Sequence, residues 1–248
     1  MTKREEYRTK LKQLKSWDSF LLKESGLPGP RANLELVQAV ADEGDAELFE
    51  RYLTYEPLQA PTNSPQVFLA VCGVVGLGRL AAEGNRSVLK TLRGFASDPR
   101  WRMREGVAMA LQRLGDQDMD ALLREATKWS KGNPLEQRAA AAGICEPRLL
   151  HNAEQAARVL KILNDITASI AEIGDRKSDA FMALKKGLAY CWSVAVAALP
   201  DEGKRNMERW FSSQDKDVIW IMKENLKKNR LARMDAAWVK AWQVKLTR

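Results

Sequence analysis

The chain has 248 residues, of which 45% are hydrophobic and 29% are charged. An apolar fraction close to the globular average allows a sizeable core and excludes a wholly disordered chain. The formal net charge is +8 and the isoelectric point is about 9.4. This excess of bases favours association with polyanions, such as nucleic acid or an anionic membrane surface, and carries no information about the fold.

Helical periodicity dominates the chain. Apolar residues recur every three or four positions, most clearly between Leu149 and Gly174, and no segment shows the alternation of a strand. Prolines that suit a first helical turn and glycines that follow periodic runs mark the boundaries. They predict helices over residues 2–24, 30–42, 45–56, 65–82, 86–96, 99–114, 117–130, 134–145, 152–173, 177–198, 203–212, 216–228 and 233–246.

Charge is distributed unevenly along these helices. Residues 33–56 carry seven acids and one base, a local balance of −6. Residues 86–104 carry six bases and one acid, a balance of +5, and residues 203–248 carry twelve bases and five acids, a balance of +7. The segregation predicts one positive region on the surface, although ordinary solvated helix faces would produce a similar pattern.

The expected helix 65–82 contains the glycine-rich run from Gly73 to Gly78. The run lies inside an apolar helical segment and does not follow a strand. Close packing against a neighbouring helix therefore explains the glycines better than a dinucleotide-binding turn.

A repeated pattern begins at Asp98, where a turn is followed by an apolar residue, arginines and small residues. The pattern returns 34 residues later and, less completely, after Asp215. Helix pairs with a period of about 30 to 47 residues are typical of solenoids. The equivalent positions are Trp101, Leu135 and Val218, then Arg104 and Arg138, then Ala108 and Ala142.

This pattern resembles the second helix of a HEAT repeat. The resemblance implies an all-α fold, namely an α-solenoid (superhelix) of antiparallel helix pairs with HEAT-like repeats, in a single domain over residues 1–248. Short connections make neighbouring helices antiparallel. In such solenoids the second helix of each pair lines the concave face, so helices 99–114, 134–145 and 216–228 are expected to face inward.

The segments Trp101–Leu111 and Asp215–Leu231 also look like the HEAT-like-repeat DNA glycosylases of the alkylation-repair group. Those enzymes hold duplex DNA in a basic concave groove and stabilise a positively charged sugar with an aspartate near tryptophans and an arginine. Helix 65–82, where the resemblance puts this aspartate, contains none. The resemblance therefore implies DNA affinity without assigning a catalytic residue.

Signatures of enzymes, metals and cofactors are scarce. The chain has one histidine, His151, which excludes most acid–base and nucleophilic sets, and it lacks a phosphate-binding glycine loop. Cys72, Cys145 and Cys191 lie far apart in apolar runs without metal-ligand spacing. We expect them to be buried thiols in a reducing compartment, and we expect no metal and no cofactor.

The targeting signals are equally sparse. The longest uncharged apolar stretches, 67–77 and 189–199, are shorter than the roughly 20 residues that span a bilayer. Residues 1–15 are rich in Lys, Arg and Glu and lack the apolar core of a secretory signal. We therefore expect a cytoplasmic protein without a membrane partner.

Basic and aromatic residues of the three helices expected to face inward form the candidate binding site. Guanidinium groups can grip phosphates bidentately, and tryptophan can stack on a base. The alternatives are that Trp101 fills a core position, that Arg104 and Arg138 bind neighbouring turns, and that residues 223–230 form a solvated helix end. The residues expected to bind nucleic acid are Arg100, Trp101, Arg102, Arg104, Arg138, Lys223, Lys227 and Arg230.

Three functions follow from these observations. The first is a non-enzymatic binding protein whose basic concave surface holds an anionic partner, with DNA favoured over an acidic protein segment. The second is a DNA glycosylase acting on alkylated bases. The third is a protein–protein scaffold whose ligand binds elsewhere, for example at Trp238 and Trp242, which share a helix face unless they close the last core layer.

Overall fold

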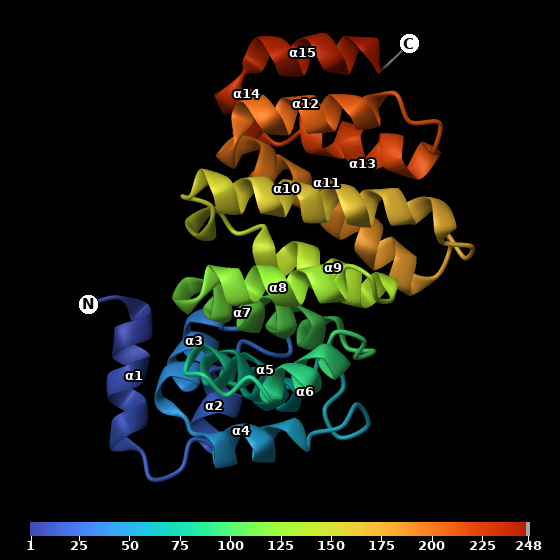
Figure 1. The fold of residues 1–248 in the computed structure, drawn as a ribbon. Coiled ribbons are helices and arrows are strands. Elements are labelled where there is room, and N and C mark those ends of the chain that lie inside the picture. Colours follow the sequence, from blue (N-terminus) through green and yellow to red (C-terminus); the bar gives the residue numbers. More distant parts are fainter. Residues whose placement is uncertain (247–248) are drawn as a thin grey trace. The chain divides into compact units, whose positions relative to one another are not determined.

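The computed structural model describes residues 1–246, and all regular structure in that range is helical (Figure 1). The range contains fifteen α-helices and two short 3₁₀ helices. Contacts divide the chain into two compact units, Met1–Gln117 and Asp118–Arg248. The all-α prediction is confirmed for the described residues, while the solenoid and the single domain over residues 1–248 stay predictions.

The first unit is built around one apolar helix. Its helices are α1 (Lys3–Gln13), α2 (Asp18–Glu24), α3 (Leu34–Glu43), α4 (Ala46–Leu53), α5 (Gln66–Ala82), α6 (Val88–Phe95) and α7 (Trp101–Gln117). Thirteen of the seventeen residues of α5 are buried, because α3, α4 and α7 pack around it. A helix that is hydrophobic on all sides needs neighbours on all sides, so α5 forms the core of the unit.

Two helix boundaries near the N-terminus differ from the sequence prediction. The expected helix over 2–24 is two helices, because the chain is extended at Leu14 and the Trp17 indole donates to the Leu11 carbonyl at 3.0 Å. The helix expected from residue 30 begins at Leu34, where the Asn33 side chain accepts the Leu36 N–H. Side-chain caps therefore override the proline signal at Pro30.

The glycines of α5 allow close helix packing, as predicted. A Cβ atom at Gly78 would lie 2.4 Å from the Cα of Ala110 in α7. A Cβ atom at Gly76 would lie 2.4 Å from the Phe49 ring in α4. The missing side chains let two neighbouring helices approach α5 closely.

Replacing Gly78 with alanine should destabilise the first unit. Alanine favours a helix, but its methyl group would meet the backbone of Ala110, which cannot rotate away. Overpacking of this kind costs about 1–3 kcal/mol. Urea unfolding of Gly78→Ala should therefore show a lower midpoint. Gly94→Ala in α6 is the control, since nothing lies within 4 Å of a Cβ atom there, and it should gain about 0.5–1 kcal/mol. Equal stability of the two variants would contradict the close approach.

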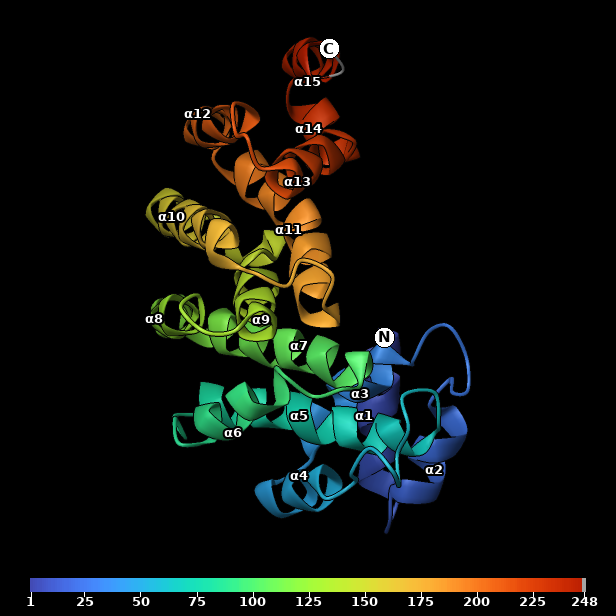
Figure 2. The ribbon, with the colours of Figure 1, turned by 90° about the vertical axis from the view of Figure 1, so that its right-hand side faces the viewer.

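The second unit has α11 at its centre. Its helices are α8 (Met119–Trp129), α9 (Pro134–Ile144), η1 (Pro147–Leu149), α10 (Ala153–Ser169), η2 (Ile170–Glu172), α11 (Asp179–Ala198), α12 (Pro200–Phe211), α13 (Lys216–Leu226), α14 (Asn229–Met234) and α15 (Ala236–Lys245). Figure 2 shows α8, α10 and α12 in one layer and α9, α11 and α13 in the other. Helix α11 packs against members of both layers. Its Trp192 is fully buried, and the indole N–H donates to Thr167.

The C-terminal helix expected over 233–246 is also divided. Asp235 has a non-helical backbone conformation, and its side chain accepts the Trp238 N–H at 2.9 Å, so α15 starts anew after α14. Trp238 and Trp242 then pack against Phe211. Both indoles donate to Glu208, at 2.7 and 3.3 Å. These contacts agree with the interpretation that the two tryptophans close the last core layer.

The three cysteines are buried, as predicted. Burial raises the pKa of the Cys72 and Cys145 thiols, which keeps them protonated. Residues 1–246 contain no group of three or more His, Cys, Asp and Glu side chains placed to hold a metal ion. None of the helices in the described part of the chain has the length and hydrophobicity required to cross a bilayer.

Candidate functional site

The first of the expected binding residues, Arg100, is buried inside the first unit, with 4% of its surface exposed. Its guanidinium donates to both carboxylate oxygens of Asp98, at 2.9 and 2.7 Å. The same group donates to the carbonyls of Tyr55, at 2.7 Å, and Ala60, at 3.3 Å. These bonds fasten the loop before α5 to the start of α7 and take up most of the donors that a phosphate would need.

Arg102 and Arg104 also bind nearby turns. Arg102 is buried and donates to the carbonyls of Thr62, at 2.9 Å, and Gly29, at 2.7 Å. Burial lowers the pKa of its guanidinium, whose carbon lies 4.3 Å from the centre of the Trp101 ring. Arg104 donates to the carbonyl of Asp98 at 2.7 Å. This geometry favours a structural role for the arginines, whereas Trp101 keeps 44% of its surface exposed.

Truncating Arg100 should destabilise the protein. Arg100→Ala would leave the Asp98 carboxylate buried without its partner, which costs about 3–5 kcal/mol for a buried pair. Thermal or urea unfolding should show a clear loss of stability. Wild-type stability in this variant would mean that the arginine is available to a ligand instead.

The remaining expected residues lie in the second unit. Arg138 is on α9, Lys223 is on α13, Lys227 directly follows α13, and Arg230 is on α14. Lys223 and Lys227 continue an exposed stripe of α13 that begins with Lys216 and Trp220, at spacings of four, three and four residues. The stripe therefore presents lysines and a tryptophan on one side of the helix.

Helix α11 contributes its own exposed strip beside α13. Lys186 and Tyr190 are exposed and four residues apart, so they share a face. Gly187 lies between them and faces the Arg138 side chain of α9. A Cβ atom at Gly187 would lie 3.2 Å from the Cγ of Arg138, so the glycine leaves room for that side chain. The guanidinium carbon of Arg230 lies 4.7 Å from the centre of the Tyr190 ring, and its N–H donates to the tyrosine hydroxyl.

These contacts bring α9, α11, α13 and α14 together on one surface, which we call the basic face. Its members are ten exposed or half-exposed cations and aromatic residues of those helices and of the segments that follow them: Arg138, Lys186, Tyr190, Lys216, Trp220, Lys223, Lys227, Lys228, Arg230 and Arg233. Four of the eight expected binding residues belong to it, and the other four lie in the first unit.

An ion-pair cluster positions the start of α13 on α11. Asp217 is 7% exposed and accepts hydrogen bonds from Arg176, at 2.9 Å, and Lys185, at 2.8 Å. Asp215 caps α13 and also binds Arg176, at 2.9 Å. The Lys185 ammonium lies 4.5 Å from the centre of the Trp220 ring. The cluster thus holds Trp220 in a fixed place at the edge of the basic face.

The charge of Asp215 should make stability depend on pH. Burial opposes its ionisation, but hydrogen bonds from Arg176 and from the backbone N–H groups of Asp217 and Val218 outweigh burial and lower its pKa below 3.8. A lowered folded-state pKa gives stability that is present above the unfolded pKa and is lost as the pH falls through the folded one.

The variant Asp215→Asn keeps a side chain that can cap the helix but removes the charge. The unfolding free energy of the wild type should exceed that of Asp215→Asn at neutral pH, and the gap should close as the pH falls below 3.8. A gap that is constant from neutral to acidic pH would contradict the ion pair.

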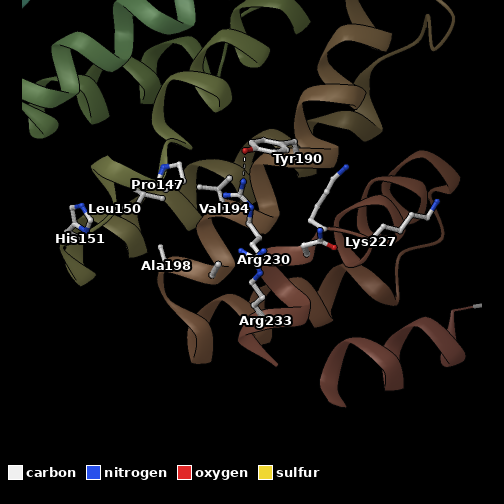
Figure 3. Close-up of a pocket in the computed structure, with 12 residues that line it drawn as sticks. Pro147, Leu150, His151, Tyr190, Val194, Ala198, Lys227, Arg230 and Arg233 are labelled. Carbon is white, nitrogen blue, oxygen red and sulfur yellow. Dashed lines mark hydrogen bonds between the residues drawn. The ribbon is translucent and has the colours of Figure 1, made fainter. Parts of the chain in front are cut away.

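A pocket of about 850 Å³ opens at one end of the basic face (Figure 3). One part of its wall is apolar and includes Leu150, Val194 and Ala198, and Tyr190 stands beside this part. The pocket has no carboxylate in its lining. The cations that line it are Lys227, Lys228, Arg230 and Arg233, and His151 lies at its rim.

Sequence reasoning missed several members of this site. Lys186 and Tyr190 carry a readable signal, because they stand four residues apart, at helical spacing, in the largely apolar segment 180–198. Arg233 and His151 carry none, since they are far apart in the chain and meet only through the packing of α11 with α14 and η1.

Comparisons of the chain with protein-family models, with curated proteins and with solved structures find no match.

Proposed function

We propose that this chain is a HEAT-like helical-repeat protein that binds nucleic acid through the basic face of its second unit. The observation that carries the proposal is the gathering of outward-facing lysines and arginines, with Tyr190 and Trp220 among them, on adjacent helices of one layer. This combination of cations and exposed aromatic rings provides contacts for both phosphates and bases.

The repeat part of the proposal is supported by the helix order in the second unit. Successive helices alternate between the α8, α10, α12 layer and the α9, α11, α13 layer (Figure 2). Such pairs stack into solenoids, which present extended surfaces to their partners. In this arrangement α9 and α13, which carry the sequence pattern of the second repeat helix, share the layer that bears the basic face.

The chemistry of the face favours a polyanion with planar groups. Lysines and arginines that neutralise phosphates release condensed counterions, which makes binding favourable and dependent on salt. Aromatic residues add about 1–3 kcal/mol for each base that stacks on them. Tyr190 is 46% exposed and Trp220 is 37% exposed, so both rings retain surface for such contacts.

Charge reversal on the basic face should weaken DNA binding. We would compare Lys186→Glu/Lys223→Glu with the control Lys161→Glu/Arg205→Glu, which changes the net charge equally on α10 and α12 of the other layer. All four positions are exposed. Binding of an internally labelled DNA, followed by fluorescence anisotropy across salt concentrations, should be tight and salt-dependent for the wild type and the control.

For the basic-face variant we expect the affinity to fall about tenfold or more and the slope of log affinity against log salt to decrease by about two. Equal losses in both variants would mean that only the net charge matters. A wild-type chain that does not bind DNA at low salt would overturn the proposal, and a pull-down with acidic peptides would then be the next experiment.

A further inference from the structure

The pocket at the end of the basic face has two chemically different sides. The apolar side is formed by η1, the loop that follows it and the second half of α11, through Pro147, Leu150, Val194, Ala197 and Ala198. The cationic side is formed by the segment from Lys227 to Arg233 (Figure 3). A ligand that fills the pocket therefore needs an apolar or planar part and an anionic part close together.

The size of the pocket suits a single nucleotide. Its volume of about 850 Å³ lies within the range of roughly 300–1,000 Å³ that is usual for sites of small ligands and cofactors. A pocket of this volume holds about one nucleotide of a longer polymer at a time.

Tyr190 and Arg230 are paired at the cationic side. The guanidinium lies over the tyrosine ring and donates to its hydroxyl, so each holds the other in place. Tyrosine rings and arginine planes are both surfaces on which unstacked bases are bound. Since nearly half of Tyr190 remains exposed, a base or sugar can lie against it.

The charge of the pocket comes from one short segment. Lys228, Arg230 and Arg233 come from six consecutive residues and line the same pocket, whereas Lys227 also forms an ion pair with Glu224. A phosphate monoester carries about −1.5 to −2 charges at neutral pH. A phosphodiester carries only one, so several cations in one pocket favour a terminal monoester over an internal phosphate.

We infer that this pocket binds one nucleotide with a terminal phosphate monoester, and that this nucleotide is the end of a strand held on the basic face. The assignment of this nucleotide to the end of a strand rests on the proposed function. The base lies against Tyr190 and the apolar side, and the phosphate lies among Lys228, Arg230 and Arg233. A free mononucleotide has the same chemistry, and the experiment separates the two sources.

The test compares internally labelled single-stranded DNAs of one sequence that end in a 5′-phosphate, a 3′-phosphate or hydroxyl groups only. For the wild type, a phosphate at one of the two ends should raise the affinity about tenfold over the hydroxyl-ended strand. Arg233→Ala should lose most of this gain, and Arg233→Lys should keep part of it. Because Arg233 belongs to the basic face, Arg233→Ala should also bind the hydroxyl-ended strand somewhat more weakly, so the gain is measured as the ratio of the two affinities for each variant. Arg205→Ala on α12 is the matched control and should keep the whole gain.

A second variant tests the pocket without changing α14, in case substitutions at Arg233 unfold that helix. Ala198→Glu places a carboxylate at the apolar side of the pocket, at the last residue of α11, and should also abolish the gain while thermal unfolding shows a folded protein. Adenosine monophosphate added as a competitor should displace the phosphorylated end only weakly, since it lacks the contacts of the strand with the rest of the face.

The outcomes distinguish the two proposals. Equal affinity for phosphorylated and hydroxyl-ended strands, with binding otherwise intact, would overturn the pocket inference and leave the proposed function standing. Failure of every strand to bind at low salt would overturn the proposed function. Adenosine monophosphate bound as tightly as the phosphorylated strand would overturn the strand-end assignment and identify a free nucleotide as the ligand.

Discussion

Burial of α11 on most of its circumference is the constraint on which the second unit depends. The helix packs against α9, α10, α12 and α13, and only the strip that includes Lys186 and Tyr190 remains in contact with solvent. Charged side chains of the middle of this helix either lie on that strip, as Lys186 does, or bind a carboxylate, as Lys185 does, so the packing of the core also decides where charge can gather. The basic face is therefore a consequence of how the core is closed.

The two groups of basic residues show how location decides the role of a charge. Near the start of α7, guanidinium groups are buried, and backbone carbonyls of distant loops satisfy them. Buried charges need such partners, so these arginines hold the fold of the first unit together. On α11, α13 and α14 most cations lie at the surface, where water solvates the charge and no buried partner is needed. Arg176, just before α11, and Lys185 on α11 instead bind Asp217, and the Lys185 ammonium lies over the Trp220 ring.

The sequence was a good guide to the helices and a partial guide to the site. Periodicity located nearly every helix, and the glycines of α5 correctly indicated close packing, because both signals are local. The breaks at Trp17 and Asp235 were missed, since each depends on a hydrogen bond made by one side chain in the folded state. Arg230 and Lys227 were found through their local charge.

The buried state of Arg100 and Arg102 could not be read from the sequence, because the backbone carbonyls that accept from them lie between 40 and 73 residues away in the chain. The pocket was missed for a similar reason. Its apolar side and its cationic side come from separate segments that are adjacent only after α11 packs against η1 and α14.

The most direct test of the account is lysine footprinting of the wild-type chain with and without DNA. Acetylation of each lysine is measured by mass spectrometry at low salt. If the basic face holds nucleic acid, then Lys186, Lys223 and Lys228 become protected, while the exposed Lys90 on α6 and Lys161 on α10 react as before. Uniform protection of all five lysines, or protection of Lys90 and Lys161 alone, would contradict the assignment of the binding surface.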